Sequence, residues 1–309
     1  MTAPAARPGA LGDWTPSRLG LGTMSFTGRG TWGPPRDPDA ARALLRRAAE
    51  LGVQLFDTAD SYGPEVAEEL VREALHPYDG LLIATKGGFR RHGPHEWEAD
   101  CRPESLRAAC EGSLRRLGLE RIDLYQLHLV DAAVPVEESV GALAELQGEG
   151  KIRHIGVCNV SPGQLERART AAGIVSVQNR YSLVERSSRP VLARCERDGL
   201  AFVAWAPLGK GFLSAPAGAL AAVARRHGAT AGQVALAWVL RSPAAFAIPG
   251  TSSLSHLEEN VGARGLELTA EDAAELEREG FRRYGRRRLV RKARARAGRV
   301  KAALRGPRR

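Results

Sequence analysis

Residues 37–57 read DPDAARALLRRAAELGVQLFD, and this stretch decides the fold class. Asp37-Pro38 predicts a helix start, with a capping side chain before a proline in the first turn. The apolar side chains that follow have the i, i+3, i+4, i+7, i+8 spacing of one helix face, and they are Ala41, Leu44, Leu45, Ala48 and Ala49. A short β-forming run, Gln54–Asp57, comes next. A helix followed by a short strand that ends in a polar residue is the repeating unit of an α/β fold.

The same alternation continues along most of the chain. We expect eight strands, at Leu19–Met24, Gln54–Asp57, Leu81–Thr85, Ile122–Leu127, Ile152–Val157, Ser176–Gln178, Ala201–Trp205 and Phe246–Ile248. Helices are expected at Ala40–Leu51, Val66–Leu75, Pro103–Leu117, Val136–Gln147, Arg189–Asp198, Thr230–Leu240 and Leu254–Val261, with capping boxes opened by Ser161 and Thr230. Eight alternating units predict an α/β fold of the (β/α)8 TIM barrel type, closed within a single domain.

Other elements are expected outside the eight units. A helix at Ala219–His227 is additional, and a helix at Ala270–Arg278 follows the last unit. Thr15–Arg18 predicts a turn linked to a short N-terminal hairpin that plugs the barrel floor. The competing architecture, a doubly wound sheet, carries a Gly-x-Gly-x-x-Gly fingerprint after its first strand. The segment Leu19–Gly22 lacks this spacing, which disfavours a dinucleotide site of that kind.

The net charge of +10 is unevenly distributed. Residues 282–309 hold fourteen Arg or Lys and no acidic residue, so the rest of the chain has a net charge of 10 − 14, or about −4. We therefore predict a barrel at residues 1–281 and a basic C-terminal tail at residues 282–309. The tail has the composition of a solvated appendage. An amphipathic helix that binds nucleic acid or an anionic surface is the less favoured alternative.

The sequence has no feature typical of a membrane or metal protein. No apolar run reaches the ~20 residues of a membrane-spanning helix, and Met1–Ala10 does not resemble a secretory signal. The cysteines are isolated, at Cys101, Cys110, Cys158 and Cys195, and no Cys/His cluster has zinc-ligand spacing. These features predict a cytoplasmic protein without a structural disulfide and without a metal.

Polar side chains gather where three neighbouring strands are expected to end. Asp57 and Tyr62 follow the second strand, Lys86 the third and His128 the fourth. Each alone has an ordinary explanation: a capped turn, a stapled loop, a solvated amine or a hydrogen-bonded core histidine. Because the active sites of such barrels lie at the carboxyl ends of the strands, we expect the four side chains to converge.

These four groups suit proton donation to a carbonyl oxygen. A tyrosine has a pKa of about 10, and a nearby ammonium group lowers it by favouring the phenolate. A carboxylate beside the ammonium group keeps it charged and in place, and an imidazole can polarise a carbonyl. The set therefore predicts a general acid for a developing alkoxide, with no metal required.

Seven blocks resemble the aldo-keto reductase superfamily in order, across roughly Leu19–Leu266. They are Phe56–Gly63, Ile83–Gly88, Asp123–His128, Gly150–Ser161, Val177–Leu183, Ala204–Leu213 and Ile248–Asn260. The resemblance implies that the catalytic residues are Asp57, Tyr62, Lys86 and His128, with Tyr62 as the acid. It also implies an oxidoreductase that reduces aldehydes or ketones to alcohols by direct hydride transfer from NADP(H).

The resemblance further implies a cofactor site. Asn159 and Gln178 match ligands of the nicotinamide carboxamide, and Trp205 falls where an aromatic ring stacks on the nicotinamide, with a core tryptophan as the alternative. The pyrophosphate would be lined by Ala206, Pro207, Leu208 and Gly211. The adenosine end would comprise Gly250, Thr251, Ser252, Ser253, His256, Glu259 and Asn260, where a helix N-terminus suits phosphate. Further contacts are expected from Gly22, Thr23, Asp57 and Cys158.

This sequence departs from the family pattern at three positions. Cys158 stands where a serine is usual, and a thiol is a poorer donor. Gly250 and His256 replace a lysine and an arginine that commonly grip the 2′-phosphate. NADP(H) is therefore favoured and NAD(H) remains possible.

The βα loops predict the substrate pocket. Phe26, Trp32 and Phe89 are the expected wall residues, for aromatic or medium aliphatic aldehydes and ketones. Arg90 and Arg91 are expected to be a solvated pair, with an anion contact as the alternative. Two rival functions are an NADP(H)-binding redox sensor that docks to a partner, and a metal-dependent hydrolase. The complete set of four proton-handling groups disfavours the first, and the absence of clustered His and Asp disfavours the second.

Overall fold

Eight parallel strands form the centre of the molecule in a computed structural model that describes residues 9–215 and 217–279. The order around the sheet is β1 (Leu21–Gly22), β2 (Leu55–Asp57), β3 (Leu82–Gly87), β6 (Ile122–Leu127), β7 (Ile152–Cys158), β8 (Ile174–Arg180), β9 (Ala201–Trp205) and β10 (Ala245–Ile248). The ring closes where Leu19 pairs with Ala247, whose carbonyl accepts a 2.9 Å hydrogen bond from the Gly20 amide. The predicted (β/α)8 barrel is confirmed.

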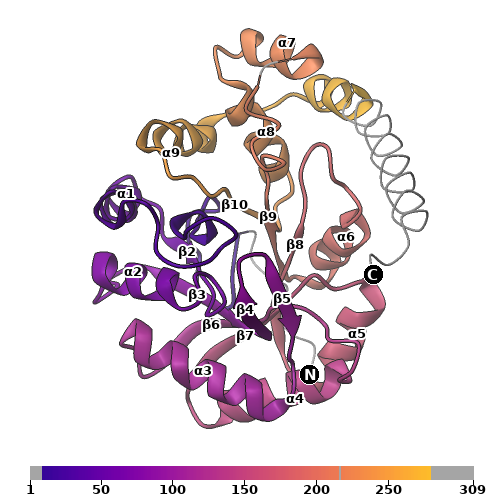
Figure 1. Cartoon of the computed structure of the whole chain (residues 1–309). Helices are drawn as coiled ribbons and strands as arrows, with labels where there is room; N and C mark the ends of the chain where they lie inside the picture. The colour runs from indigo at the N-terminus through magenta and orange to yellow at the C-terminus, as the bar shows by residue number, and fades with distance from the viewer. Residues whose placement is uncertain (1–8, 216, 280–309) are drawn as a thin grey trace, which may run out of the picture.

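Helices surround this ring, as Figure 1 shows. They are α1 (Pro38–Glu50), α2 (Val66–Leu75), α3 (Pro103–Leu117), α4 (Val136–Gly148), α5 (Pro162–Ala171), α6 (Arg189–Asp198), α7 (Gly218–Arg226), α8 (Ala231–Leu240) and α9 (Leu254–Val261). The predicted caps are present: Asp37 accepts from the Ala40 amide, and Ser161 and Thr230 each form a capping box. A further helix begins at Ala270, outside the barrel units as expected.

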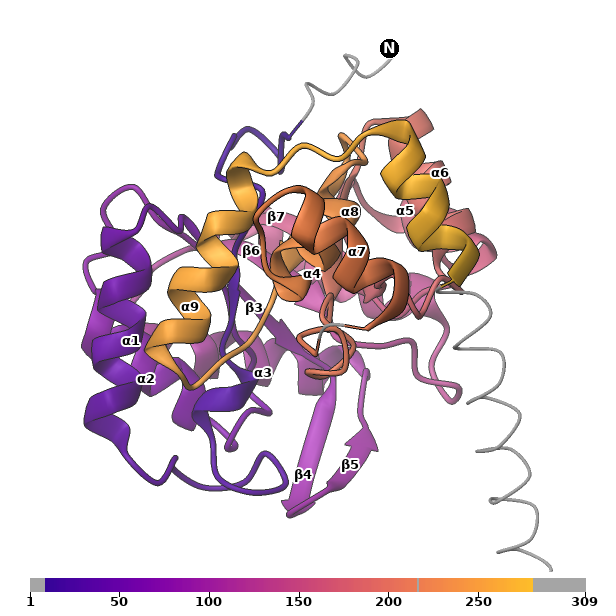
Figure 2. The ribbon, with the colours of Figure 1, turned by 90° about the horizontal axis from the view of Figure 1, so that it is seen from above.

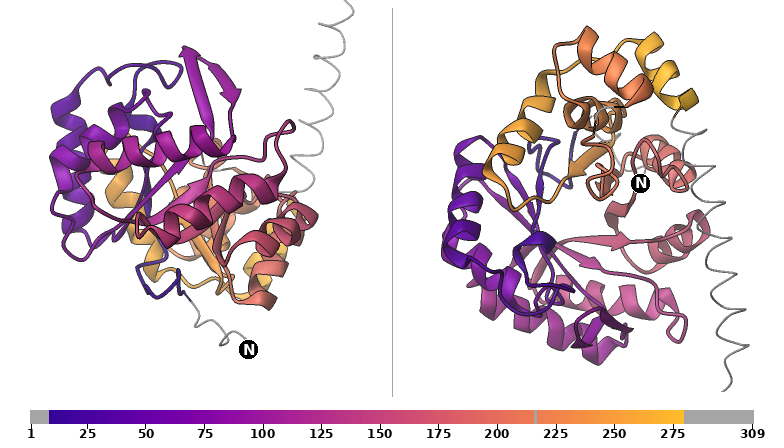
Figure 3. Two further views of the ribbon diagram at one scale, coloured as in Figure 1. Left: turned by 90° about the horizontal axis from the view of Figure 1, so that it is seen from below. Right: turned by 45° about the horizontal axis from the view of Figure 1, so that its top comes forward.

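The N-terminal residues close the floor of the barrel. Leu11 and Trp14 pair in an antiparallel bridge, and Leu11 is fully buried. Both pack with the side chains that fill the barrel interior, including Leu55, Leu124 and Phe246. The expected floor hairpin is therefore present. In the views from above and from below, the start of the described chain lies at the opposite end of the barrel from strands β4 and β5 (Figure 2, and Figure 3, left).

Two elements differ from expectation. The first strand is short because Thr23 leaves it and Met24–Phe26 forms a turn of 3-10 helix (η1). The segment after β3, expected as a loop, is an antiparallel hairpin of β4 (Phe89–Gly93) and β5 (Glu96–Ala99). Both of its strands are mostly polar, so they lack the apolar alternation that marks a strand in sequence.

Within residues 9–215 and 217–279, no helix is long and apolar enough to cross a membrane. The same part of the chain contains no group of three or more His, Cys, Asp or Glu placed to hold a metal ion. All four cysteines are free and buried. The predicted domain boundary after residue 281 and the basic tail at 282–309 lie outside the described residues.

Candidate active site

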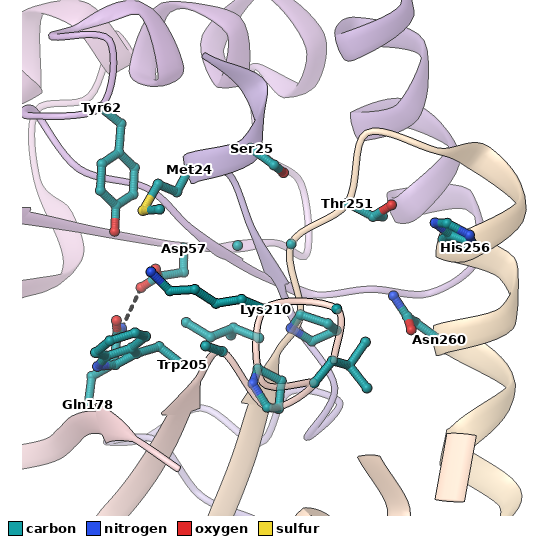
Figure 4. Close-up of a pocket in the computed structure, with 18 of the residues that line it drawn as sticks. Met24, Ser25, Asp57, Tyr62, Gln178, Trp205, Lys210, Thr251, His256 and Asn260 are labelled. Carbon is teal, nitrogen blue, oxygen red and sulfur yellow. Dashed lines mark hydrogen bonds between the residues drawn. The ribbon is translucent and has the colours of Figure 1, made fainter. Parts of the chain in front are cut away.

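A pocket of about 600 Å³ opens at the carboxyl ends of the strands and extends toward α9. Most of the predicted site residues line it: Gly22, Asp57, Tyr62, His128, Asn159, Gln178, Trp205, Ala206, Pro207, Leu208, Gly211, Gly250, Thr251, His256, Glu259 and Asn260. Figure 4 shows Tyr62, Asp57 and Gln178 at one end, and Thr251, His256 and Asn260 at the other. The site is thus elongated. One end holds side chains that can exchange protons, and the other end lies at the start of α9.

Lys86 and Asp57 form a buried ion pair at the first end. The Lys86 Nζ lies 2.6 Å from Asp57 Oδ1 and donates a second hydrogen bond of 2.7 Å to the Thr58 carbonyl. The other carboxylate oxygen accepts hydrogen bonds from Gln178 at 2.6 Å and Gln126 at 3.3 Å. Because both oxygens are satisfied, the carboxylate is held in one orientation beneath the ammonium group.

Tyr62 lies beside this pair. The Lys86 Nζ is 5.1 Å from the centre of the Tyr62 ring. Burial raises the pKa of Tyr62 to about 12, against the charge of Lys86, which lowers it. The ammonium group acts in the expected direction, but burial outweighs it, so the group is a phenol at neutral pH. Burial on its own lowers the pKa of Lys86. The charge of Asp57 raises this pKa, and the net shift is upward.

His128, the residue directly after β6, completes this end of the pocket. Its ring meets the Tyr62 ring edge-on, with centroids 5.8 Å apart, and its Nδ1 lies 3.4 Å from the Ser61 hydroxyl. Burial, and then the charge of Lys86, hold the pKa of His128 well below its usual range. A neutral imidazole therefore stands next to the phenol.

Asn159 and Trp205 are linked across the pocket. Asn159 has a left-handed backbone with φ 59°, a conformation that asparagine tolerates better than most residues. Its Nδ2 donates to the His128 carbonyl at 3.0 Å, and its Oδ1 accepts from Trp205 Nε1 at 3.0 Å. Trp205 is half-buried and lines the pocket, so its ring is not enclosed by the core.

The far end of the pocket is built around the start of α9. Ser253 caps this helix through a 3.4 Å hydrogen bond from the His256 amide. A side chain at Gly250 would bring a Cβ within 3.1 Å of the Gly22 carbonyl oxygen, so a small residue suits this close approach. Glu259 accepts a 2.5 Å hydrogen bond from the Thr230 hydroxyl at the cap of α8. Polar side chains at the start of α9 thus line this end of the pocket.

The geometry agrees with comparisons to known proteins. The family model described as "Aldo/keto reductase family" matches residues 18–279. The chain belongs to the aldo/keto reductase family. It is 47% identical over 271 residues to an uncharacterized oxidoreductase of Schizosaccharomyces pombe, covering 87% of this chain and 89% of the relative. It is 44% identical over 275 residues to pyridoxine 4-dehydrogenase of Escherichia coli, covering 86% of this chain and 96% of that enzyme.

Solved structures of other aldo/keto reductases have the same fold. The thermostable aldo-keto reductase Tm1743 with the inhibitor epalrestat matches with a TM-score of 0.78 and 31% identity, over 88% of this chain and 98% of that one. The aldo-keto reductase of Klebsiella pneumoniae in complex with NADPH matches with a TM-score of 0.72 and 29% identity, over 84% and 90%. The predicted family and enzyme class, an oxidoreductase, are confirmed.

The expected wall residues lie elsewhere than predicted. Phe26 is 1% exposed and packs in the core beneath α1, because η1 turns it inward and exposes Met24 toward the pocket. Trp32 pairs with Gly63 by a backbone bridge, outside the pocket lining. Phe89 packs edge-on to His128, with centroids 4.8 Å apart, behind the pocket surface. Met24 and Trp97 are the apolar side chains that take this place.

Some predicted cofactor residues do not line the pocket. The amide and hydroxyl of Thr23 donate to the Asp57 carbonyl at 2.9 and 3.1 Å, which ties β1 to β2. Cys158 lies 3.6 Å from Gln126 Oε1, and burial raises the pKa of its thiol. Ser252 is exposed and does not line the pocket.

Lys210 is a site residue that the sequence motifs do not indicate. It lines the pocket from the loop after β9, and Figure 4 shows its side chain extending into the pocket. Gly209, Lys210 and Gly211 have successive φ values of 61°, 60° and 82°. Glycines on either side are the signal that this loop bends sharply. Nothing in the sequence, however, indicates where the lysine between them points.

Proposed function

We propose that this chain is an NADP(H)-dependent reductase of aldehydes and ketones, with Tyr62 as the general acid. The observation that carries the proposal is the Lys86–Asp57 pair beside a buried phenol and a neutral imidazole. These groups lie at one end of a pocket whose other end meets the start of α9. A nicotinamide enzyme needs a proton donor and a site for phosphate groups. The first end of the pocket supplies the proton donor, and the helix N-terminus at the other end suits phosphate.

The pocket suits an extended dinucleotide. We assign the nicotinamide end to Asn159, Gln178 and Trp205, the pyrophosphate to the loop Ala206–Gly211, and the adenosine end to the first turns of α9. The Lys210 side chain also lines the pocket, and in Figure 4 it extends from the loop after β9 toward Asp57. The Klebsiella pneumoniae neighbour in complex with NADPH supports the choice of cofactor. When bound, NADP(H) would supply the hydride.

The residues of the chain then handle the proton. The Tyr62 hydroxyl gives its proton to the carbonyl oxygen as negative charge develops there. The Lys86 ammonium stabilises the resulting phenolate, and Asp57 keeps the ammonium in position. The Ser61 hydroxyl lies near Nδ1 of His128 and donates to it in this proposal. The other ring nitrogen, Nε2, then carries the proton and donates a hydrogen bond to the carbonyl oxygen of the substrate.

The pocket wall supports aromatic aldehydes as the substrate class. Tyr62, His128, Trp97 and Met24 form a mostly aromatic surface next to the proposed acid. Flat aromatic aldehydes bury more apolar area against such a wall than short aliphatic ones. The resemblance to pyridoxine 4-dehydrogenase makes pyridoxal, an aromatic aldehyde, the first compound to test.

The test is the loss of NADPH absorbance with a panel that includes pyridoxal, benzaldehyde and butanal. We expect turnover with at least the aromatic aldehydes. Tight NADPH binding without turnover of any compound would instead support the redox-sensor alternative. No NADPH binding would contradict the cofactor assignment.

A further inference from the structure

Arg91 lies in β4 and is surrounded by main-chain carbonyl groups. The acceptors are the carbonyl oxygens of Gly30 (3.0 Å), Thr31 (2.9 Å), Ser61 (2.7 Å), Gly93 (3.3 Å) and Glu96 (2.8 Å). A guanidinium group has five N–H donors. The five acceptors therefore satisfy its whole donor set with neutral oxygens. This is neither the solvated side chain nor the anion contact that the sequence suggested.

These acceptors belong to three different segments at the mouth of the barrel. Gly30 and Thr31 come from the loop after η1, and Ser61 from the loop after β2. The other two acceptors lie in the β4–β5 hairpin itself. The two loops are also joined by the Trp32–Gly63 bridge. A single side chain thus ties the hairpin to the two loops beside it.

The same guanidinium group packs on the pocket wall. Its Cζ lies 3.7 Å from the centre of the Trp97 ring and 5.7 Å from that of Trp32. Trp97 lines the pocket and lies edge-on to Phe89, with centroids 5.1 Å apart. Stacking of a planar cation on an indole fixes the orientation of the ring.

Ser61 connects Arg91 to the proposed acid. Its carbonyl accepts the shortest of the five hydrogen bonds, and the next residue along the chain is Tyr62. The Ser61 hydroxyl lies 3.4 Å from His128 Nδ1. Arg91 therefore contacts both the backbone next to the phenol and the wall that faces the substrate, although it does not line the pocket itself.

We propose that Arg91 is a positioning residue that sets the distance between the Trp97 wall and the Tyr62 hydroxyl, and so determines the preference for aromatic over short aliphatic aldehydes. This inference rests on the proposed function. A lysine at this position keeps the charge but has three donors and no planar face, so it cannot replace the contacts.

The test compares wild type with Arg91→Lys on benzaldehyde and butanal. We expect kcat/KM for benzaldehyde to fall at least tenfold, mainly through KM, while butanal changes by less than threefold and the Kd for NADPH is unchanged. If Arg91 only stabilised the fold, its substitution would lower kcat/KM equally for both substrates. Arg90→Lys is the matched control, because Arg90 is exposed on the other side of β4 and pairs with Asp100 at 2.5 Å. It should leave the benzaldehyde-to-butanal ratio unchanged.

A second measurement does not depend on activity. Acrylamide quenching of tryptophan fluorescence should increase in Arg91→Lys, and the increase should disappear in a Trp97→Phe background. An unchanged substrate ratio, an unchanged quenching constant, or loss of NADPH binding in Arg91→Lys would each overturn the proposal. Absence of turnover in wild type would count against the proposed function, while the quenching result would still decide whether Arg91 holds Trp97 in place.

Discussion

The Lys86 ammonium group lies 2.6 Å from the Asp57 carboxylate, and both side chains are almost entirely removed from solvent. A buried pair of this kind is stable only when the remaining hydrogen-bonding positions are filled. Here Thr58 accepts from the lysine, and Gln178 and Gln126 donate to the carboxylate. The pair is therefore a complete unit, and removal of one member leaves the other as an uncompensated charge.

Lys86→Met should destabilise the protein by about 3–5 kcal/mol, because it leaves the Asp57 carboxylate buried without its partner. The measurement is the free energy of unfolding from urea titration. The double variant Lys86→Met/Asp57→Asn is the control, and it should recover part of the loss because no charge remains. If the single and double variants are equally stable, the buried charge does not dominate the cost.

The pH dependence of carbonyl reduction should reflect a protonated Tyr62. Burial raises its pKa to about 12, so the phenol keeps its proton across the neutral range. An acid with a raised pKa is active below that value and loses activity only as the pH approaches it. We expect kcat for reduction to have no alkaline limb between pH 6 and 9. A decline centred near pH 7 to 8 would show that another group controls the proton transfer.

The buried carboxyl group of Asp60 should make the stability of the folded protein depend on pH. Burial, and then the charge of Glu68, raise the pKa of Asp60 to about 8, and its Oδ1 lacks a hydrogen-bond partner among the described residues. The unfolded value is about 4. Folding therefore takes up a proton in this window, so stability is complete below about pH 4 and declines as the pH rises toward 8. Asp60→Asn should flatten this decline.

The check is the melting temperature of wild type and Asp60→Asn at pH 5 and pH 8.5. The drop between the two pH values should be smaller in the variant, and the difference between the proteins isolates Asp60 from other titrating groups. Parallel pH profiles would mean that Asp60 is ionised in the folded protein at neutral pH.

His256→Arg should tighten NADPH binding relative to NADH. The side chain lies at the adenosine end of the pocket, on the first turn of α9, where an arginine could pair with a 2′-phosphate. A charge-assisted hydrogen bond contributes about 1.5–3 kcal/mol, which corresponds to roughly tenfold or more in affinity. Tryptophan-fluorescence titration with both cofactors measures this, with His256→Gln as the uncharged control. Equal tightening for NADH would place the 2′-phosphate elsewhere.

Most of the barrel follows from local sequence signals. The spans predicted for β6, β9, α2, α3, α6 and α9 are those observed, because each has the apolar spacing of its element. A proline in the first turn and a left-handed glycine at the end also bound α3 and α6. The β4–β5 hairpin was missed because Arg90, Arg91 and His92 give it no apolar alternation. The Arg91 side chain joins the hairpin to the neighbouring loops, and no local pattern encodes such tertiary contacts.

Some residues of the site could likewise be predicted from the sequence, and others could not. Asp57, Lys86 and His128 could be placed together because the ends of parallel strands meet at one edge. Met24 and Phe26 could not be assigned to their sides from sequence, because a single turn of η1 decides which one faces the pocket. Lys210 depends on three successive left-handed residues, a conformation that the sequence permits but does not direct.

The role of Tyr62 is tested most directly by its conversion to phenylalanine. The variant removes one hydroxyl group and keeps the ring that packs against Ala59, Ala67 and Trp97. The measurement is kcat for NADPH-dependent reduction of an aldehyde that wild type turns over, together with the Kd for NADPH. We predict a loss of about 10²–10⁴-fold in kcat with an unchanged Kd. Turnover at the wild-type rate in Tyr62→Phe would contradict the assignment of Tyr62 as the proton donor.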